Sequence, residues 1–293
     1  MKINPVYRQE TKTSTRSFRF PMVILLFNSV LAVVALLDMY SMITQVRRTA
    51  EIQYSSFLSM YVFVAAVEFI LLLLLIPALT SGSISGERER QTLNLMLTTQ
   101  MTAADIVLGK LFASLSTVLL LIVSSFPILS LVFIYGGVMV KDIILLVLCY
   151  SMTALVPGCI GIFCSASFKK STIATVASYC MTMFLIVGTV AVNHFASSFM
   201  QMASSRKENG TGGLFYLLLF NPASTFRMAL SSQIGTGREL ADFFPWLSSG
   251  TENIVTEHWL AAGIVAQALL SAFLLWLAVK RVEPYKKKRG RRR

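Results

Sequence analysis

SGSISGERERQTLNLMLTTQ, residues 81–100, lies between two long apolar runs of the chain. The run before it covers residues 57–80 and the run after it covers residues 107–135. Both exceed the roughly 20 apolar residues that a helix needs to cross a bilayer. The charges between them alternate in sign as Glu87-Arg88-Glu89-Arg90 and therefore cancel. This pattern predicts two membrane spans joined by a short polar segment.

The rest of the chain is similarly apolar. Of its 293 residues, 55% are hydrophobic and only 14% are charged, and the mean hydropathy is +0.68. A soluble domain would carry about a quarter charged residues. A helix satisfies its own backbone hydrogen bonds in lipid, so each long apolar run can form a span. We predict an all-α integral membrane protein whose residues 1–293 form a single transmembrane domain with six spans, at residues 20–44, 57–80, 107–135, 143–166, 173–195 and 258–280.

The basic residues predict how these spans are oriented. Six spans place both termini on the same side, and most of the 26 Lys and Arg residues lie on that side. Cytoplasmic loops carry the excess of Lys and Arg, so we expect cytoplasmic termini and a multi-pass protein of the plasma membrane. Residues 1–19 would then be a cytoplasmic arm, residues 196–257 an outer loop and residues 281–293 a cytoplasmic tail. Because this basic tail directly follows a span, we expect it to contact lipid head groups rather than nucleic acid.

Sequence motifs for enzyme chemistry are absent. The chain has no HExxH zinc motif and no GxxxxGK[ST] phosphate-binding loop. The nearest match to that loop ends in Gly109-Lys110 but has Ala104 where the first glycine should be. The four cysteines lie in the fourth and fifth spans without CxxC spacing. We therefore expect no catalytic residue, metal site or cofactor in this chain.

The segment between the second and third spans has a helical pattern. Glu87 can pair with Arg90 three residues later. Thr102-Ala-Ala-Asp105 has the spacing of a capping box that starts the next helix. Such a helix could lie in the lipid interface, but interfacial helices usually have a Lys- and Arg-rich polar face. Balanced charges favour docking to another protein. An apolar stripe completes the helix: Leu93, Met96, Leu97 and Met101.

The stretch ISGERERQTLNLMLTTQMTAADIVLGKL, residues 84–111, resembles a segment of the permease subunits of ABC transporters of the type-2 exporter class. In that family a run like I-x-x-E-[RK]-E-x-G-T-L-E-L-L-L-T-T-P-x-x-x-x-[DE]-I-[VL]-x-G-K follows the second span. The chain departs from it at Gln91, Asn94 and Gln100, where the family usually has Gly, Glu and Pro. The matching residues are Ile84, Glu87, Arg88, Glu89, Thr92, Leu93, Leu95, Leu97, Thr98, Thr99, Ile106, Gly109 and Lys110.

Three further stretches carry the same resemblance. NPVYRQETKTSTRSFRF, residues 4–20, is similar to the family's cytoplasmic N-terminal connecting helix. SASFKKSTIATVASY, residues 165–179, is similar to the short inner loop before the fifth span. LFYLLLFNPASTF, residues 214–226, is similar to the outer segment with short or re-entrant helices before the last span. The resemblance therefore extends over nearly the whole six-span chain.

The resemblance implies the transmembrane subunit of an ATP-driven exporter that forms the translocation path. Its partners would be a separate subunit that binds ATP-Mg and a second permease copy or paralogue, in a homo- or heterodimer. The segment after the second span would be a coupling helix seated in a cleft of the ATP-binding subunit. Glu87 and Glu89 would face basic residues there, and Leu93 and Leu97 would hold the helix against the membrane core. The residues implied in coupling are Glu87, Arg88, Glu89, Arg90, Thr92, Leu93 and Leu97.

Polar residues and prolines inside the spans are further candidates. An ionised Glu68 in the middle of the second span would cost about 2.5–3.5 kcal/mol. It either lies on the substrate path or beside the neighbouring permease, or it is protonated in a structural hydrogen bond. Pro127 and Pro157 should kink their helices, either as hinges or only to shape the bundle. Possible partners of Glu68 are Asn28, Ser124 and Ser125.

Two other function classes compete with an ATP-driven exporter. An ion-coupled secondary carrier predicts internal repeats and several charges near the midplane. The sequence shows no convincing repeat and one strong intramembrane charge, Glu68. A membrane assembly or signalling protein could use the motion of an ATPase without moving a solute, and the sequence leaves that hypothesis open.

Overall fold

A computed structural model describes residues 5–49, 54–93, 96, 101–136, 140–203, 212–234 and 258–283. Its described residues are mostly helical and include no strand. Six helical segments are long and apolar enough to cross a membrane, and each overlaps a predicted span. The predicted all-α fold with six spans is confirmed. The spans are α2 (Arg19–Thr49), α3 (Tyr54–Thr80), α6 (Ala103–Gly136), α7 (Val140–Ser167), the segment that runs from α8 (Ser171–Met183) to α9 (Thr189–Ala203), and α13 (Trp259–Val282).

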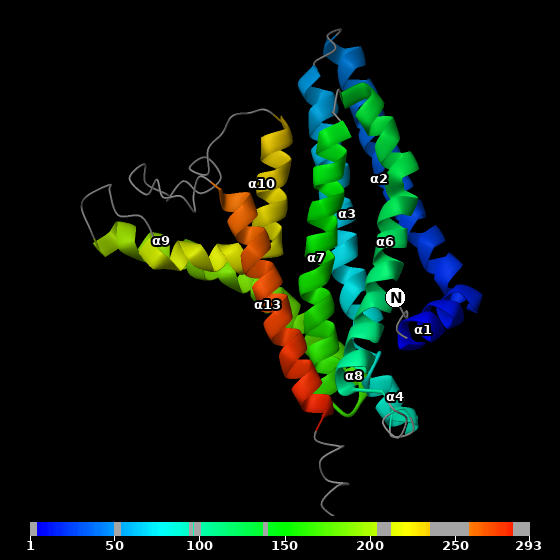
Figure 1. Cartoon of the computed structure of the whole chain (residues 1–293). Helices are drawn as coiled ribbons and strands as arrows, with labels where there is room; N and C mark the ends of the chain where they lie inside the picture. Colours follow the sequence, from blue (N-terminus) through cyan, green and yellow to red (C-terminus); the bar gives the residue numbers. More distant parts are fainter. Residues whose placement is uncertain are drawn as a thin grey trace, which may run out of the picture.

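Helix α7 lies at the centre of the bundle and packs against α3, α6, α8 and α13 (Figure 1). Small and β-branched side chains such as Ala154, Cys159 and Ile160 are buried on it, which permits close helix approach. Helix α2 lies at the edge, and leucines such as Leu25 and Leu36 remain exposed on it. Exposed apolar side chains on a helix of this length are suited to contact with lipid.

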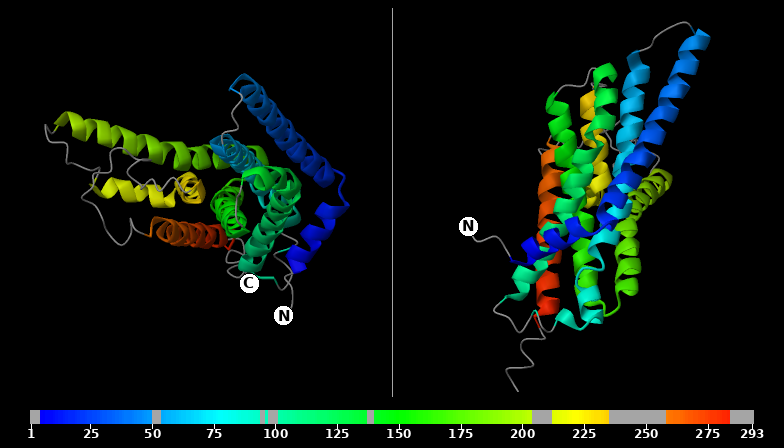
Figure 2. Two further views of the ribbon diagram at one scale, coloured as in Figure 1. Left: turned by 90° about the horizontal axis from the view of Figure 1, so that it is seen from above. Right: turned by 90° about the vertical axis from the view of Figure 1, so that its right-hand side faces the viewer.

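Two short helices mark one end of the bundle. Helix α1 (Pro5–Arg16) lies across the bundle axis beside α6, and α4 (Ser85–Glu89) follows the end of α3 (Figures 1 and 2). Helix α13 ends at the same end, where α7 also turns into α8. We call this the α4 end. The N-terminal helix that the resemblance implies is therefore present as α1.

The described part of the segment after α3 is interrupted at Gln91, whereas the sequence predicts one continuous helix from Glu87. Helix α4 ends at Glu89, and the backbone of Gln91 has φ 60°, a left-handed conformation that does not continue an α-helix. Leu93, in a new helical turn, is buried. Leu97 lies outside the described residues.

The start of α6 confirms the predicted capping box. The amide of Asp105 donates to Thr102 Oγ1 at 3.1 Å, and the amide of Thr102 donates to Asp105 Oδ2, also at 3.1 Å. These reciprocal bonds satisfy backbone N–H groups that the first helical turn leaves free. They fix where the third span begins.

The fifth span is bent rather than straight. Between α8 and α9, the π-helical segment η1 (Phe184–Gly188) inserts an extra residue into the helical hydrogen-bond pattern. Beyond it, α9 turns away from the bundle and projects sideways (Figures 1 and 2). The sequence predicted one uninterrupted span over residues 173–195, because an apolar run indicates length but not the hydrogen-bond pattern inside the helix.

The segment before the last span folds back against the bundle. A 3₁₀ helix, η2 (Gly212–Phe220), leads into α10 (Pro222–Ile234), which packs against α7 and α13 (Figure 1). Phe226 of α10 stacks on Phe69 of α3 and Tyr150 of α7, with ring centroids 4.2 Å and 5.6 Å away. Short helices therefore occupy this segment, as the resemblance implies, and α10 is anchored by aromatic packing.

Candidate functional site

The start of α4 is attached to the turn between α7 and α8. Ser165 Oγ accepts hydrogen bonds from the amides of Ile84 and Ser85, both at 2.9 Å. One side chain of α7 thereby satisfies two amides at the start of α4. The hydroxyls of Ser81 and Thr175 lie 2.8 Å apart and join the end of α3 to α8. The polypeptide that enters α4 is therefore fixed to two neighbouring helices.

The charged side chains of α4 extend this attachment. Arg88 donates to the carbonyls of Ala166 and Phe168, at 2.9 Å and 3.0 Å, where α7 ends. A basic side chain suits this position because the last carbonyls of a helix lack partners within the helix. Glu89 accepts from the amide and hydroxyl of Ser171, at 2.9 Å and 2.7 Å, where α8 begins. Arg88 and Glu89 thus hold α4 against both sides of the α7–α8 turn.

Lys110 links α4 to α6 and α1. Its ammonium lies 2.6 Å from Glu10 Oε1 on α1 and 3.5 Å from Glu87 Oε1 on α4. Only 2% of the Lys110 side chain is exposed, and a buried charge of this kind needs such partners. Thr92 also donates its hydroxyl proton to the Glu87 carboxylate. Glu87 therefore forms its ion pair with Lys110. The helical spacing predicts Arg90 as the partner, and Arg90 interacts with Glu87 through its charge alone.

The implied coupling residues differ in how exposed their side chains are to a partner subunit. Glu87, Arg88 and Thr92 are half-buried, and Leu93 is buried. Glu89, Arg90 and Gln91 are exposed. The carboxylates of Glu87 and Glu89 both have partners within this chain. Their role towards another subunit remains a prediction.

Glu68 is fully buried between spans. Ser125 Oγ on α6 donates to Glu68 Oε1 at 2.5 Å, and Ser125 is one of the partners that the sequence predicts for Glu68. Asn28 instead donates to Ser124, at 2.9 Å. Neighbouring Tyr150 donates its hydroxyl proton to the carbonyl of Ala65 on α3. Whether Glu68 has a structural role, lies on the substrate path or faces a neighbouring permease stays a prediction.

The prolines do not interrupt their helices. Helix α6 continues through Pro127 and α7 continues through Pro157. Helix α3 also contains a proline, Pro77. Its carbonyl accepts a hydrogen bond from the amide of Ser81, four residues later. A hinge at Pro127 or Pro157 remains a prediction. The described part of the fifth span departs from regular α-helix at the π-helical η1, which contains no proline.

Asn221 joins the bend in the fifth span to the turn before α10. Its Nδ2 donates to the carbonyl of Ile186 at 2.9 Å and to Thr189 Oγ1 at 2.8 Å. Its Oδ1 accepts from the amide of Ala223 at 2.8 Å and so caps α10, with Pro222 in the first helical position. The Asn-Pro pair indicates a helix start in the sequence, but its contact with a bend 35 residues earlier has no local signal.

Comparison with known families identifies the class of the protein. A model of the ABC-2 family transporter proteins matches residues 4–281. The chain belongs to this family. The permease is therefore a membrane component of an ABC transporter, a class that associates with an ATP-binding subunit. This membership favours the ABC-transporter hypothesis over an ion-coupled carrier. A search of curated proteins gave no match.

The described part of the permease offers no metal site. Among those residues, no group of three or more His, Cys, Asp or Glu side chains is placed to hold a metal ion. The polar groups at the α4 end are instead arranged as hydrogen bonds and ion pairs between helices. Such an arrangement can transmit force between elements.

Proposed function

We propose that the permease forms the translocation path of an ATP-driven exporter and receives motion from a separate ATP-binding subunit through α4. The observation that carries this proposal is the attachment of α4 to three spans. Lys110 connects it to α6, Arg88 to the end of α7, and Glu89 to the start of α8. ATP-Mg would bind to the partner, while this chain supplies the path and the mechanical connection.

The attachments favour transmission because four of them, made by Arg88 and Glu89, are hydrogen bonds of 2.7–3.0 Å. Displacing α4 alone would separate charge-assisted hydrogen bonds, which are the stronger class of hydrogen bond in proteins. Moving α4 together with the adjoining ends of α6, α7 and α8 leaves those bonds intact. A push on α4 would therefore tilt or shift three spans together. Helix α1 would move with them, because Glu10 shares Lys110 with Glu87.

The exposed tip of α4 is the proposed contact with the ATP-binding subunit. Glu87, Arg88 and Glu89 have partners that hold the helix in place. Arg90 is exposed at its end, next to Gln91. We assign Glu87 and Glu89 chiefly to anchoring and Arg90 to the contact with the partner. The α4 end would then face the cytoplasm, and two permease copies, or one copy and a paralogue, would enclose the path.

Isolation of the permease from its native membrane, scored for a co-purifying ATPase, tests this function. We expect the wild-type complex to survive isolation in nanodiscs and Arg90→Glu to lose most of the bound ATPase. Lys141→Glu is the matched control, since it reverses an exposed charge at the opposite end of the bundle. Failure of the wild type to bind the ATPase would overturn the proposal. Equal binding by Arg90→Glu would remove Arg90 from the contact.

The anchoring role needs a separate readout. Arg88→Met removes both bonds to the end of α7 but leaves the exposed tip unchanged. We expect this variant to bind the ATPase while losing the effect of the permease on ATP turnover. An unchanged effect would show that the Arg88 bonds do not carry the motion.

A further inference from the structure

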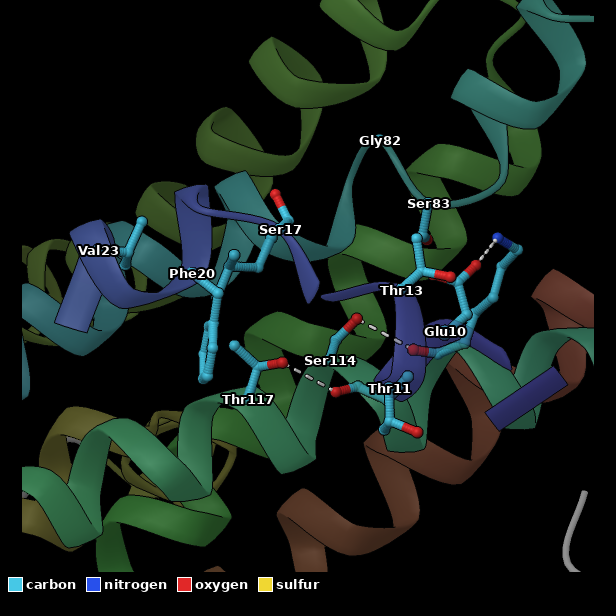
Figure 3. Close-up of a pocket in the computed structure, with 13 residues that line it drawn as sticks. Glu10, Thr11, Thr13, Ser17, Phe20, Val23, Gly82, Ser83, Ser114 and Thr117 are labelled. Atoms are coloured by element: carbon cyan, nitrogen blue, oxygen red, sulfur yellow. Dashed lines mark hydrogen bonds and ion pairs between the residues drawn. The ribbon is translucent and has the colours of Figure 1, made fainter. Parts of the chain in front are cut away.

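Helix α1 has an inner face that is fixed to the bundle. Val6 is buried there, and the Tyr7 hydroxyl lies 3.1 Å from Ser116 Oγ on α6. Glu10 reaches the ammonium of Lys110 on the same side, beside the pocket between α1 and the bundle that Figure 3 shows. Glu10 is the only acidic residue in the α1 sequence PVYRQETKTSTR, so the negative charge of this helix is paired on its inner side.

The opposite face of α1 is basic. Arg8 and Lys12 are four residues apart, which makes them neighbours on one side of the helix, and both side chains are exposed. Gln9, a neutral residue beside them, is exposed as well. In the sequence, Arg16 continues the spacing of four residues to the end of α1. The outer face therefore presents positive charge, and the only carboxylate of α1 points away from it.

The chain passes from this basic face directly into an apolar surface. Phe18, between α1 and α2, is 85% exposed. Met22 and Leu25 follow on α2, and both are exposed on a helix that is long and apolar enough to cross the membrane. Charged, aromatic and apolar side chains thus follow one another in the order of the layers of a lipid leaflet, from head group to hydrocarbon.

The position of α1 places its basic face beside the membrane surface. Helix α1 lies across the bundle axis at the edge of the molecule, where the first span begins (Figures 1 and 2). Since the bundle covers its inner face, its outer face lies towards the lipid head groups. Helices that bind at a membrane surface have a Lys- and Arg-rich polar face, which α1 has and α4, with its balanced charges, does not.

We propose that the outer face of α1 binds the head groups of anionic phospholipids. Arg8 and Lys12 would donate charge-assisted hydrogen bonds to phosphate oxygens, and Phe18 would lie at the boundary with the hydrocarbon. Helix α1 belongs to the α4 end, which we expect to face the cytoplasm, where the leaflet carries anionic lipids. An acidic surface of the ATP-binding subunit is the competing partner, and the direct passage from the basic face into the lipid-facing surface of α2 favours lipid.

Photolabelling of the full-length permease in nanodiscs tests this lipid contact. Phosphatidylcholine nanodiscs would carry a small fraction of phosphatidylglycerol with a photoreactive group close to its head group, and a parallel sample would carry phosphatidylcholine with the same group. Mass spectrometry measures labelling of the peptides that contain α1 and the start of α2. The same lipids lie on both faces of a nanodisc, so the result depends neither on the orientation in the cell nor on the role of α4.

The expected result is a preference for the anionic probe. An exposed basic residue at an anionic surface contributes about a fivefold preference, so Arg8 and Lys12 together should give about 25-fold stronger labelling by phosphatidylglycerol. High salt should reduce this ratio, because it screens exposed charges.

Two double variants assign the preference to α1. Arg8→Gln with Lys12→Gln removes both exposed charges and should bring the two probes to nearly equal labelling. Arg47→Gln with Lys141→Gln is the matched control, because it removes two exposed basic residues at the opposite end of the bundle, and it should keep the preference. All four side chains are exposed, so we expect both variants to fold as the wild type does.

Equal labelling by the two probes in the wild type would overturn the proposal, because the charge of the head group would not be recognised. An unchanged preference in Arg8→Gln with Lys12→Gln would also overturn it, because other residues would then attract the lipid. Equal labelling in the wild type, together with loss of the bound ATPase by that double variant in phosphatidylcholine alone, would reject lipid in favour of the ATP-binding subunit.

Discussion

Lys110 places a positive charge where almost no solvent reaches, and both carboxylates that stabilise it come from other helices. Lys110→Met would leave the carboxylates of Glu10 and Glu87 without their cation, and because these side chains are 38% and 28% exposed, water screens part of the loss and we expect a cost of about 1 kcal/mol. We expect a lower unfolding temperature in detergent and weaker stimulation of the ATPase, with Lys110→Arg close to the wild type. Wild-type stability in Lys110→Met would show that these ion pairs do not hold α1 and α4.

Gln91, two residues after the end of α4, has a backbone conformation that glycine adopts at lower cost. A left-handed conformation costs a residue with a Cβ atom about 1–2 kcal/mol, and the family pattern usually has glycine here. Gln91→Gly should therefore raise the unfolding temperature, whereas Gln91→Val should lower it. Arg90→Gly is the control, because Arg90 has φ −77° and gains nothing from glycine. Equal shifts in Gln91→Gly and Arg90→Gly would contradict this explanation.

At the scale of single residues, the sequence predicted local contacts better than distant ones. The capping box of Thr102 and Asp105 follows from a spacing of three residues, and the structure confirms it. The ion pair of Lys110 joins residues 23 and 100 positions apart in the chain, and no local pattern contains such a pairing. The helical spacing therefore predicts Arg90, three residues after Glu87, as its partner.

At the scale of elements, the bend in the fifth span is hydrogen-bonded to Asn221 from another segment. A π-helical turn leaves carbonyl groups without their usual α-helical partners, and Asn221 donates to the carbonyl of Ile186. The apolar run of this span predicts a membrane helix but contains no sign of that bond. This contact joins the bend to the turn between η2 and α10, and we expect it to support the bend.

Substitutions of Asn221 separate its two tasks. Asn221→Ser keeps an oxygen that can cap α10 but loses the amide that reaches Ile186, while Asn221→Ala loses both. A buried carbonyl without a partner costs about 1–3 kcal/mol, and a lost cap costs about 1 kcal/mol more. Unfolding temperatures should therefore fall in the order wild type, serine variant, alanine variant. Hydrogen exchange should rise in α9 for both variants, and unchanged exchange there would contradict the proposed support of the bend.

The packing of α3 against α7 depends on a glycine. A Cβ atom at Gly161 would overlap the side chain of Thr80, whereas one at Gly158 would meet Leu111 at 3.6 Å, an ordinary contact. Gly161→Ala should destabilise the permease by about 1–3 kcal/mol, the usual cost of overpacking. Gly158→Ala should be neutral or slightly stabilising, because alanine favours helix. Thermal unfolding of both variants checks this, and equal effects would mean that α3 and α7 separate readily.

At the scale of the whole molecule, the sequence predicted the spans but not their arrangement. Bilayer thickness sets the length of each apolar run, so the six predicted spans overlap the six helical segments found. The central place of α7 depends on which faces of which helices meet, as where Tyr150 of α7 bonds to the carbonyl of Ala65 on α3. Those contacts cannot be obtained from hydropathy, because every span is apolar on most of its surface.

Orientation is the whole-molecule property on which the proposed coupling depends, since ATP is available in the cytoplasm. The excess of basic residues predicts that the α4 end is cytoplasmic. Arg90→Cys places a thiol at that end and Lys141→Cys places one at the other, with the exposed Cys180 replaced by serine in both. A membrane-impermeant maleimide should label Lys141→Cys in intact cells and Arg90→Cys only after permeabilisation. The reverse pattern would put α4 outside the cell, where no ATP-binding subunit could reach it.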